Sequence, residues 1–281
     1  MTSQTIAPPP TIGVFDSGFG GLTVLRSLVR RMPRARYAFL GDTARLPYGS
    51  KSRRTIARYA AESAQFLVRE QGAQFLVIAC NTASALALDA IQDAVPVPVL
   101  GVIEPGATAA HAASKTGDVL VIATDATVQS HAYAAACRAR GLRALEKACP
   151  LLVPLVEEGW TNHPVTAEVI RIYLDELVAD AAAQGLNPDA LVLGCTHYPL
   201  LRPLIERAVP AGMAVIDSAE SAAEAAVRLV NGQLAPGAGG VGEPGTIIRC
   251  FATDSVEKFE RLGSRFLERP VGQVELVDLG G

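Results

Sequence analysis

Two stretches of this sequence are alike, and they decide which fold we expect. Residues 75–82 read F-L-V-I-A-C-N-T, and residues 190–197 read A-L-V-L-G-C-T-H. Each stretch is a short apolar run, typical of a buried parallel strand, and each ends at a cysteine that small polar residues follow. Two such runs can also arise by chance, since cysteine is commonly buried. Two related halves of the chain are the more economical interpretation.

Apolar runs alternate with segments of helical spacing on both sides of these stretches. Leu22, Leu25 and Leu28, for example, recur at helical spacing after an apolar run at residues 11–15. This alternation predicts βαβ units and a mostly parallel sheet. Strands are also expected at residues 37–40, 97–102, 119–123, 247–252 and 274–279. Helices are expected at residues 55–71, 131–139 and 167–184, and one that residue 253 or 254 caps is expected to end at residue 267.

We therefore expect an α/β protein of two similar domains, each with a mostly parallel sheet flanked by helices. Residues 1–103 and 215–281 are expected to form the first domain, and residues 104–214 the second. The crossing between the halves is expected at E-P-G, residues 104–106. The stretch at residues 231–245 is rich in Gly and Pro and is expected to be a flexible surface loop.

The composition excludes several classes of protein. Of 281 residues, 49% are apolar and 19% charged, so the chain can bury a substantial core. A net charge of −3 argues against a broad nucleic-acid-binding surface. No apolar run approaches the roughly 18 residues of a membrane span, and residues 1–10 read as a disordered lead-in without a signal-peptide core. Five widely spaced cysteines without C-x-x-C indicate a reducing, cytoplasmic location.

Cys80 and Cys195 are the strongest candidates for chemistry. Each is expected at the carboxyl end of a parallel strand, the edge at which open α/β sheets bind ligands. Each also precedes a helix, whose first N–H groups attract anions and lower the pKa of a thiol. The expected site therefore suits a carboxylate substrate and an activated thiolate. The alternative is two buried, inert cysteines, and their matching contexts argue against it.

Asp16, His197 and the turn at residues 46–50 are weaker candidates. Asp16 begins D-S-G-F-G-G, which matches neither G-x-G-x-x-G nor a P-loop, so nucleotide binding has weak support. Asp16 either caps the following helix or acts as a functional carboxylate. His197 would lie on the same side as Cys195 if the strand continues, and could then carry its proton; otherwise it is a polar residue at a helix start. The L-P-Y-G-S turn either places hydroxyl groups at a ligand or is an ordinary loop.

The remaining cysteines, histidines and lysines indicate neither a metal nor a cofactor. A structural role is expected for Cys137, Cys149 and Cys250. No metal-ligand spacing with the cysteines is found for His111, His131 and His163. No lysine lies in a motif for a Schiff base, so a pyridoxal cofactor is not indicated. The pair Glu157-Glu158 either forms an acidic loop or supplies a site carboxylate.

Taken together, these motifs resemble those of the glutamate racemases over most of the chain. The matching segments are I-G-V-F-D-S-G-F-G-G-L-T-V at residues 12–24, G-D-T-A-R-L-P-Y-G at 41–49, A-C-N-T-A-S-A at 79–85, G-V-I-E-P-G at 101–106, L-G-C-T-H-Y-P-L-L at 193–201 and I-D-S-A at 216–219. The resemblance implies two α/β domains with the substrate in the cleft between them, and an isomerase that interconverts L- and D-glutamate without a cofactor. It also implies a supply of D-glutamate for peptidoglycan and a homodimer.

The resemblance further implies a role for each site residue. Cys80 would remove the α-proton of D-glutamate and Cys195 that of L-glutamate. Asp16 would assist Cys80, while His197 and Glu157 would assist Cys195, with Glu157 chosen over Glu158 because it occupies the V-E position after P-L. Substrate binding is implied for Asp16, Ser17, Tyr48, Gly49, Asn81, Thr82, Thr124, Thr196 and His197.

Two alternatives stay open at this point. The first is an aspartate racemase or another related racemase, and such relatives often carry C-T-E at the second cysteine, where this chain has C-T-H. The second is a non-catalytic protein of the same fold that binds an amino acid, against which the presence of both cysteines argues. Neither nucleic acid nor a membrane is expected as a partner.

Overall fold

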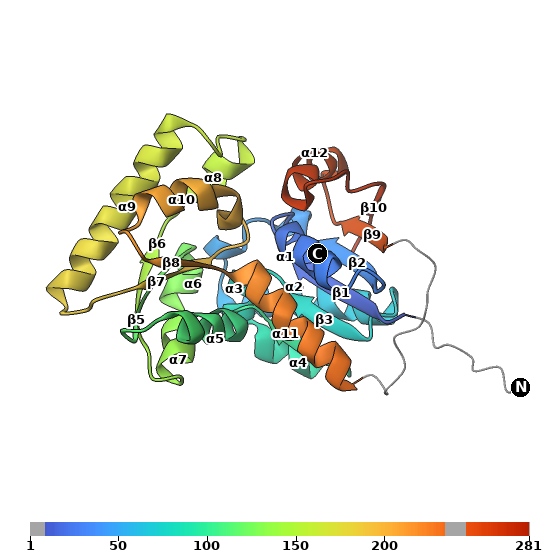
Figure 1. Cartoon of the computed structure of the whole chain (residues 1–281). Coiled ribbons are helices and arrows are strands. Elements are labelled where there is room, and N and C mark those ends of the chain that lie inside the picture. The colour runs from blue at the N-terminus through green and yellow to red at the C-terminus, as the bar shows by residue number, and fades with distance from the viewer. Residues whose placement is uncertain (1–8, 234–245, 281) are drawn as a thin grey trace, which may run out of the picture.

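The computed structural model describes residues 9–233 and 246–280, which form two lobes (Figure 1). A parallel sheet lies in each lobe, and helices flank it, so the expected α/β fold is confirmed. Residues 1–8 of the expected lead-in and residues 234–245 of the expected loop lie outside the described residues.

The first sheet has six strands, and all of its pairings are parallel. β1 lies between β2 and β3, and its apolar residues are buried because helices cover both faces of the sheet. In spatial order the strands are β10 (Val274–Leu276), β9 (Ile247–Ala252), β2 (Arg36–Gly41), β1 (Thr11–Asp16), β3 (Phe75–Ile78) and β4 (Val99–Gly101).

The second sheet has four parallel strands and repeats the central order of the first. β5 lies between β6 and β7 as β1 lies between β2 and β3, and β8 follows β7 as β4 follows β3. In spatial order the strands are β6 (Arg143–Ala148), β5 (Asp118–Ala123), β7 (Ala190–Gly194) and β8 (Ala214–Asp217). The repeat gives the ends of β3 and β7, which the two cysteines follow, equivalent places in the two sheets.

Helices cover the sheets and join the lobes. α1 buries Leu22, Leu25 and Leu28 at helical spacing, and α11 packs against both α1 and α5, so it ties the lobes together (Figure 1). No helix in the described residues is long and apolar enough to cross a membrane. The helices are α1 (Leu22–Arg31), α2 (Arg53–Arg69), α3 (Asn81–Leu86), α4 (Leu88–Ala94), α5 (Ile103–Ala113), α6 (Asp125–Gln129), α7 (Ala132–Arg138), α8 (Leu152–Glu157), α9 (Pro164–Ala183), α10 (Arg202–Ala208), α11 (Ser218–Gln233) and α12 (Val256–Leu267).

Some elements differ from those that the sequence predicts. Residues 104–106 lie where the chain crosses from β4 of the first sheet to β5 of the second, as expected, but they are helical, because a proline in the first turn of α5 does not break the helix. The sequence pattern does not predict β6, because Glu146 and Lys147 interrupt its apolar residues at the edge of the sheet. The last strand ends at Leu276, before the expected residue 279.

The chain leaves the second sheet only after β8. The expected second domain ends at residue 214, whereas every residue of β8 pairs with β7, so the second sheet extends to Asp217. α11 begins at Ser218 and packs against α1 of the first lobe. We therefore propose that the first domain resumes at residue 218.

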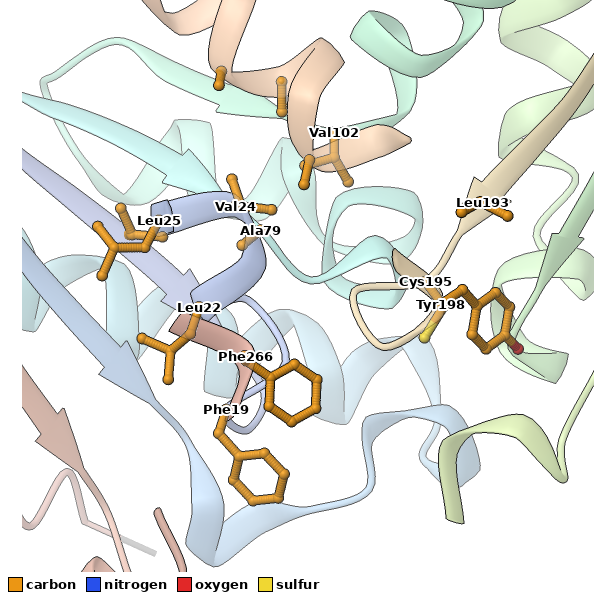
Figure 2. Close-up of a cluster of buried hydrophobic side chains, with 14 of the residues drawn as sticks. Phe19, Leu22, Val24, Leu25, Ala79, Val102, Leu193, Cys195, Tyr198 and Phe266 are labelled. Atoms are coloured by element: carbon orange, nitrogen blue, oxygen red, sulfur yellow. The ribbon is translucent and has the colours of Figure 1, made fainter. Parts of the chain in front are cut away.

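One cluster of buried side chains contains residues from both lobes. Figure 2 shows Leu22 and Phe19 near Phe266 of α12, and Cys195 with Tyr198 where the chain leaves β7. The ring centroids of Phe19 and Phe266 are 5.8 Å apart. Cys195 therefore lies at the edge of a packed interior, and apolar burial stabilises the arrangement of the two lobes.

Candidate active site

Residues at the carboxyl ends of both sheets face one cavity between the lobes. Its volume is about 340 Å³, which falls in the range of roughly 300 to 1,000 Å³ found for small-molecule sites. The wall includes every residue that the sequence assigns to the site: Asp16, Ser17, Tyr48, Gly49, Cys80, Asn81, Thr82, Thr124, Glu157, Cys195, Thr196 and His197. Apolar side chains complete it, among them Phe19, Leu46 and Val153.

Cys80 is buried in the wall of this cavity, where it is the N-cap of α3. Its Sγ lies 3.4 Å from Oγ of Ser17 and accepts a hydrogen bond from the N–H of Ala83 at 3.4 Å. Burial, and then the charge of Asp16, raise the pKa of Cys80 to about 12, although the hydrogen bonds lower it. The N–H of Ala83 at the helix start lowers this pKa as expected, but burial outweighs it, so the net shift is upward and Cys80 of the free protein is a thiol near neutral pH.

Asp16 is the last residue of β1, and it does not cap α1, whose N-cap is Gly21. Its Oδ2 accepts the N–H of Gly18 at 3.0 Å. Its Oδ1 is buried and has no hydrogen-bond partner within residues 9–233 and 246–280. Burial raises the pKa of Asp16, and the charge of His197 opposes this. Of the two interpretations from the sequence, the structure favours the functional carboxylate.

His197 connects Cys195 to a carboxylate. The chain turns after β7 instead of continuing as a strand, and the turn places Nδ1 of His197 4.0 Å from Sγ of Cys195. On the other side of the ring, Nε2 lies 3.3 Å from Oε1 of Glu157. Burial by itself would lower the pKa of His197, but its contacts with Cys195 and Glu157 outweigh burial and raise it to about 10. His197 is therefore a cation at neutral pH, directly beside Cys195.

Glu157, and not Glu158, reaches the cavity. Glu157 ends α8 and is partly buried, whereas Glu158 is exposed. The Oε2 of Glu157 also lies 3.4 Å from Nζ of Lys258, a residue of α12 in the first lobe. Burial would raise the pKa of Glu157, but its contacts with His197 and Lys258 outweigh burial and lower it. Glu157 is thus an ionised link between α12 and His197.

Three threonines bridge the lobes beside Cys80. Oγ1 of Thr82, in α3, lies 3.1 Å from Oγ1 of Thr124 and 3.4 Å from Oγ1 of Thr127. The two threonines of the second lobe are themselves 2.9 Å apart. Thr127 is fully buried and is not predicted from the sequence. The cluster holds the hydroxyl groups of Thr82 and Thr124 at the cavity wall.

The turn at residues 46–50 is held by a buried carboxylate. The hydroxyl of Tyr48 donates to Oδ2 of Asp42 at 2.5 Å, while Oδ1 of Asp42 accepts from Nε of Arg45 at 2.9 Å and from Thr253 at 3.0 Å. The phenol of Tyr48 donates its proton to Asp42, so toward a ligand in the cavity its oxygen can act only as an acceptor.

The other cysteines lie in different surroundings. All five cysteines are free and buried. Cys149, for which the sequence predicts a structural role, lines the cavity next to Pro150. Cys137 and Cys250 belong to the cores of α7 and β9. No group of three or more His, Cys, Asp or Glu side chains in the described part of the chain is arranged to hold a metal ion.

Comparison with known proteins connects this site to a family. A family model described as Asp/Glu/Hydantoin racemase matches residues 12–226. The glutamate racemase of Koribacter versatilis is 54% identical over 290 residues, which cover 97% of this chain and 98% of that protein.

Solved structures agree with the sequence comparison. A glutamate racemase of Bacillus anthracis matches with a TM-score of 0.85 at 35% identity, over 97% of this chain and 98% of that one. The glutamate racemase of Francisella tularensis, solved in complex with D-glutamate, matches with a TM-score of 0.83 at 34% identity and the same two coverages, 97% and 98%. On the family match and on these near-full-length relatives, the chain belongs to the Asp/Glu/Hydantoin racemase family.

Proposed function

We propose that this protein is a glutamate racemase that passes the α-proton between two cysteines. The observation that carries the proposal is that Cys80 and Cys195 line one cavity, each after the equivalent strand of its lobe. The similarity to glutamate racemases over nearly the whole chain supports the substrate, and one of these relatives was solved with D-glutamate.

Racemisation removes the α-proton from one face of the carbon and returns a proton to the other face. A single base would have to move around the carbanion, whereas two opposed bases stay in place. Thiols suit both tasks, because a cysteine can act as base or acid near neutral pH. Cys195 takes the proton of L-glutamate while Cys80 protonates the opposite face, and the reverse reaction exchanges the two roles. One cysteine must begin as thiolate and the other as thiol, so their ionisation is coupled.

The surroundings of the two sulfurs differ in charge. Cys80 is a thiol, because burial and Asp16 raise its pKa to about 12. Cys195 has the cationic His197 at 4.0 Å, and Glu157 holds that cation in place. A cation at this distance stabilises the negative charge that a sulfur must carry to act as a base.

Two buried polar atoms in the cavity wall match the two kinds of charged group on glutamate. Oδ1 of Asp16 is an acceptor and Nδ2 of Asn81 is a donor, and neither has a partner among the described residues. Buried polar groups normally have partners, so each of these atoms is suited to the ligand. The α-ammonium group is the donor that glutamate offers to Asp16, and its carboxylates are the acceptors that it offers to Asn81. Further polar contacts come from Ser17, Gly49, Thr82, Thr124 and Thr196.

Incubation of enantiopure L-glutamate in D₂O with reduced protein tests the proposal. The substrate should lose optical rotation and gain deuterium at the α-carbon. Folded, reduced protein that produces neither change would refute the proposal, and glutamate binding without exchange would identify a non-catalytic binder. L-aspartate assayed in parallel decides between the two racemases, and the C-T-H sequence at residues 195–197 leads us to expect much slower turnover of aspartate.

We also propose that the D-glutamate is used for peptidoglycan in the cytoplasm, and that the protein is a homodimer. The family resemblance supports the use and the dimer, and five free cysteines suit a reducing compartment. The gene should restore growth of a bacterial strain that requires added D-glutamate, and failure of an active protein to do so would refute that role. Sedimentation of the purified protein tests the dimer.

A further inference from the structure

The side chain of Asn81 is bonded at one end and open at the other. It is buried in the cavity wall, and its Oδ1 accepts a hydrogen bond from the hydroxyl of Tyr133 at 2.7 Å. Its Nδ2, in contrast, has no partner in the described residues. A buried donor without an acceptor, on the wall of a cavity, indicates that the acceptor arrives with the ligand.

Tyr133 reaches Asn81 from the other lobe through a slot between two glycines. It lies in α7 and is fully buried. A Cβ atom on Gly106 would lie 3.1 Å from Cε1 of the ring, and one on Gly194 would lie 3.0 Å from Cε2. Both distances are tighter than ordinary contacts, so the two glycines let the ring pass. These glycines belong to the segments G-V-I-E-P-G and L-G-C-T-H-Y-P-L-L, whose glycines the proposed reaction does not otherwise use.

The hydroxyl of Tyr133 acts as a donor to Asn81. Burial raises the pKa of Tyr133, so the phenol keeps its proton, and a hydrogen bond with the side chain of Ser218 also reaches this oxygen. An asparagine amide can turn over and exchange its oxygen and nitrogen. A donor held opposite one end selects the orientation with Oδ1 toward Tyr133, and this orientation leaves the N–H groups of Nδ2 free for the ligand.

We propose that Tyr133 is a positioning residue that fixes the amide of Asn81 so that Nδ2 donates to a carboxylate oxygen of the substrate. The identity of that substrate rests on the proposed function. Because Tyr133 and Asn81 belong to different lobes, the donor is oriented when the lobes take the arrangement described above. Tyr133 thereby joins the second lobe to substrate binding by the first.

Tyr133→Phe removes the hydroxyl and keeps the ring. We expect the dissociation constant and the KM for D-glutamate to rise, and kcat/KM to fall, by about tenfold to a hundredfold, the range for a hydrogen bond to a charged group. Tyr37→Phe is the matched control, because within the described residues that buried hydroxyl donates only to the main-chain oxygens of Leu28 and Met32. The control should leave both constants within about twofold of those of the parent protein.

A double-mutant cycle separates positioning from general structure. In an Asn81→Ala background the amide is absent, so Tyr133→Phe should have less than about a twofold further effect on binding. An effect as large as in the parent protein would overturn the proposal, and so would a Tyr133→Phe variant with unchanged binding. Thermal unfolding of each variant shows whether a loss of binding accompanies a loss of stability.

Gly106→Ala provides a second variant in case Tyr133→Phe does not fold. Its methyl group narrows the slot and moves the ring, so binding should weaken by about threefold to tenfold in the parent but not in the Asn81→Ala background. Calorimetric titration with D-glutamate measures binding directly. Parent protein that binds glutamate without racemising it would refute the proposed function, while the cycle would still decide the role of Tyr133.

Discussion

Cys80 and Cys195 follow equivalent strands of two sheets in which four strands have the same order, yet their surroundings are opposite in charge. Cys80 lies near the carboxyl group of Asp16, and burial together with that charge raises its pKa to about 12. Cys195 lies 4.0 Å from the imidazole of His197, whose pKa is raised to about 10 by Cys195 and Glu157 in spite of burial. The repeated fold thus duplicates the position of the sulfur but not its electrostatics.

Part of the charge around Cys195 comes from the first lobe. Lys258, on α12, lies 3.4 Å from Glu157 in the second lobe. α12 contacts α1 and β10, in the part of the first lobe that carries β9 and β10, and these two strands have no counterpart in the second sheet. The segment added to the first half therefore supplies a charge to the site of the second half.

Replacing either cysteine by alanine is expected to have the largest effect. Racemisation should fall by about 10² to 10⁴-fold in each variant, the usual contribution of a general acid or base. Cys80→Ala keeps Cys195, so it should still exchange the α-proton of L-glutamate with D₂O without inversion. Cys195→Ala should do the same with D-glutamate. Proton NMR measures both, and exchange of the opposite enantiomer would contradict the assignment of faces.

His197→Asn should sharpen the comparison, because it removes the cation from one side only. We expect racemisation to fall by about tenfold to a hundredfold, since a charged hydrogen-bonding partner of Cys195 is lost. Exchange from L-glutamate in D₂O should slow more than exchange from D-glutamate. The control is His163→Asn, an exposed histidine at the start of α9, which should behave as the parent protein. Equal slowing of both exchanges would mean that His197 serves both faces.

Asp16→Asn should make the thiol of Cys80 easier to ionise, because it lowers the pKa of Cys80. The negative charge of Asp16 raises this pKa, so its removal favours the thiolate. In a Cys195→Ala background, alkylation of Cys80 by iodoacetamide rises with pH up to the thiol pKa. At pH 8 we expect it to be about threefold to tenfold faster in Asp16→Asn.

Asp125→Asn is the matched control for this charge, because Asp125 also lines the cavity but is not among the main causes of the pKa shift of Cys80. Peptide mass spectrometry assigns the modified cysteine. A slower reaction in Asp16→Asn would show that Asp16 does not act on Cys80 through its charge.

Lys258→Met is expected to have the smallest effect. The ammonium group is half exposed and bonds Glu157 at 3.4 Å, and exposed ion pairs contribute little. We expect kcat/KM to fall by less than about fivefold at low salt, and the difference from the parent to shrink as salt is added. Lys115→Met, an exposed lysine outside the cavity wall, is the control. A loss comparable with that of His197→Asn would place Lys258 among the essential residues.

The sequence predicts the parts of the site that depend on local order. An apolar run that ends at a cysteine is read directly as a strand and its carboxyl end, so Cys80 and Cys195 are each predicted at the ligand-binding edge of a sheet. That both face one cleft is what the family resemblance implies. The family resemblance adds Glu157 and the polar pairs, and all of them line the cavity. β6 escapes prediction because an edge strand tolerates Glu146 and Lys147.

The parts that depend on tertiary packing are not predictable in this way. Nothing in the apolar pattern of α7 or α12 indicates that Tyr133 meets Asn81, or that Lys258 meets Glu157. The raised pKa of Cys80 follows from burial and from a carboxylate 64 positions earlier in the chain, whereas the sequence suggests the local effect of a helix start. Long-range burial outweighs the local helix field here.

The unlike surroundings of the two sulfurs do not allow this protein to favour one enantiomer of glutamate at equilibrium. L- and D-glutamate have the same free energy in water, so the equilibrium constant is one, and kcat/KM must be equal in the two directions at every pH. The asymmetry therefore cannot enrich either enantiomer. It can only change kcat and KM together, so a variant that raises KM for one enantiomer relative to the other must raise its relative kcat by the same factor.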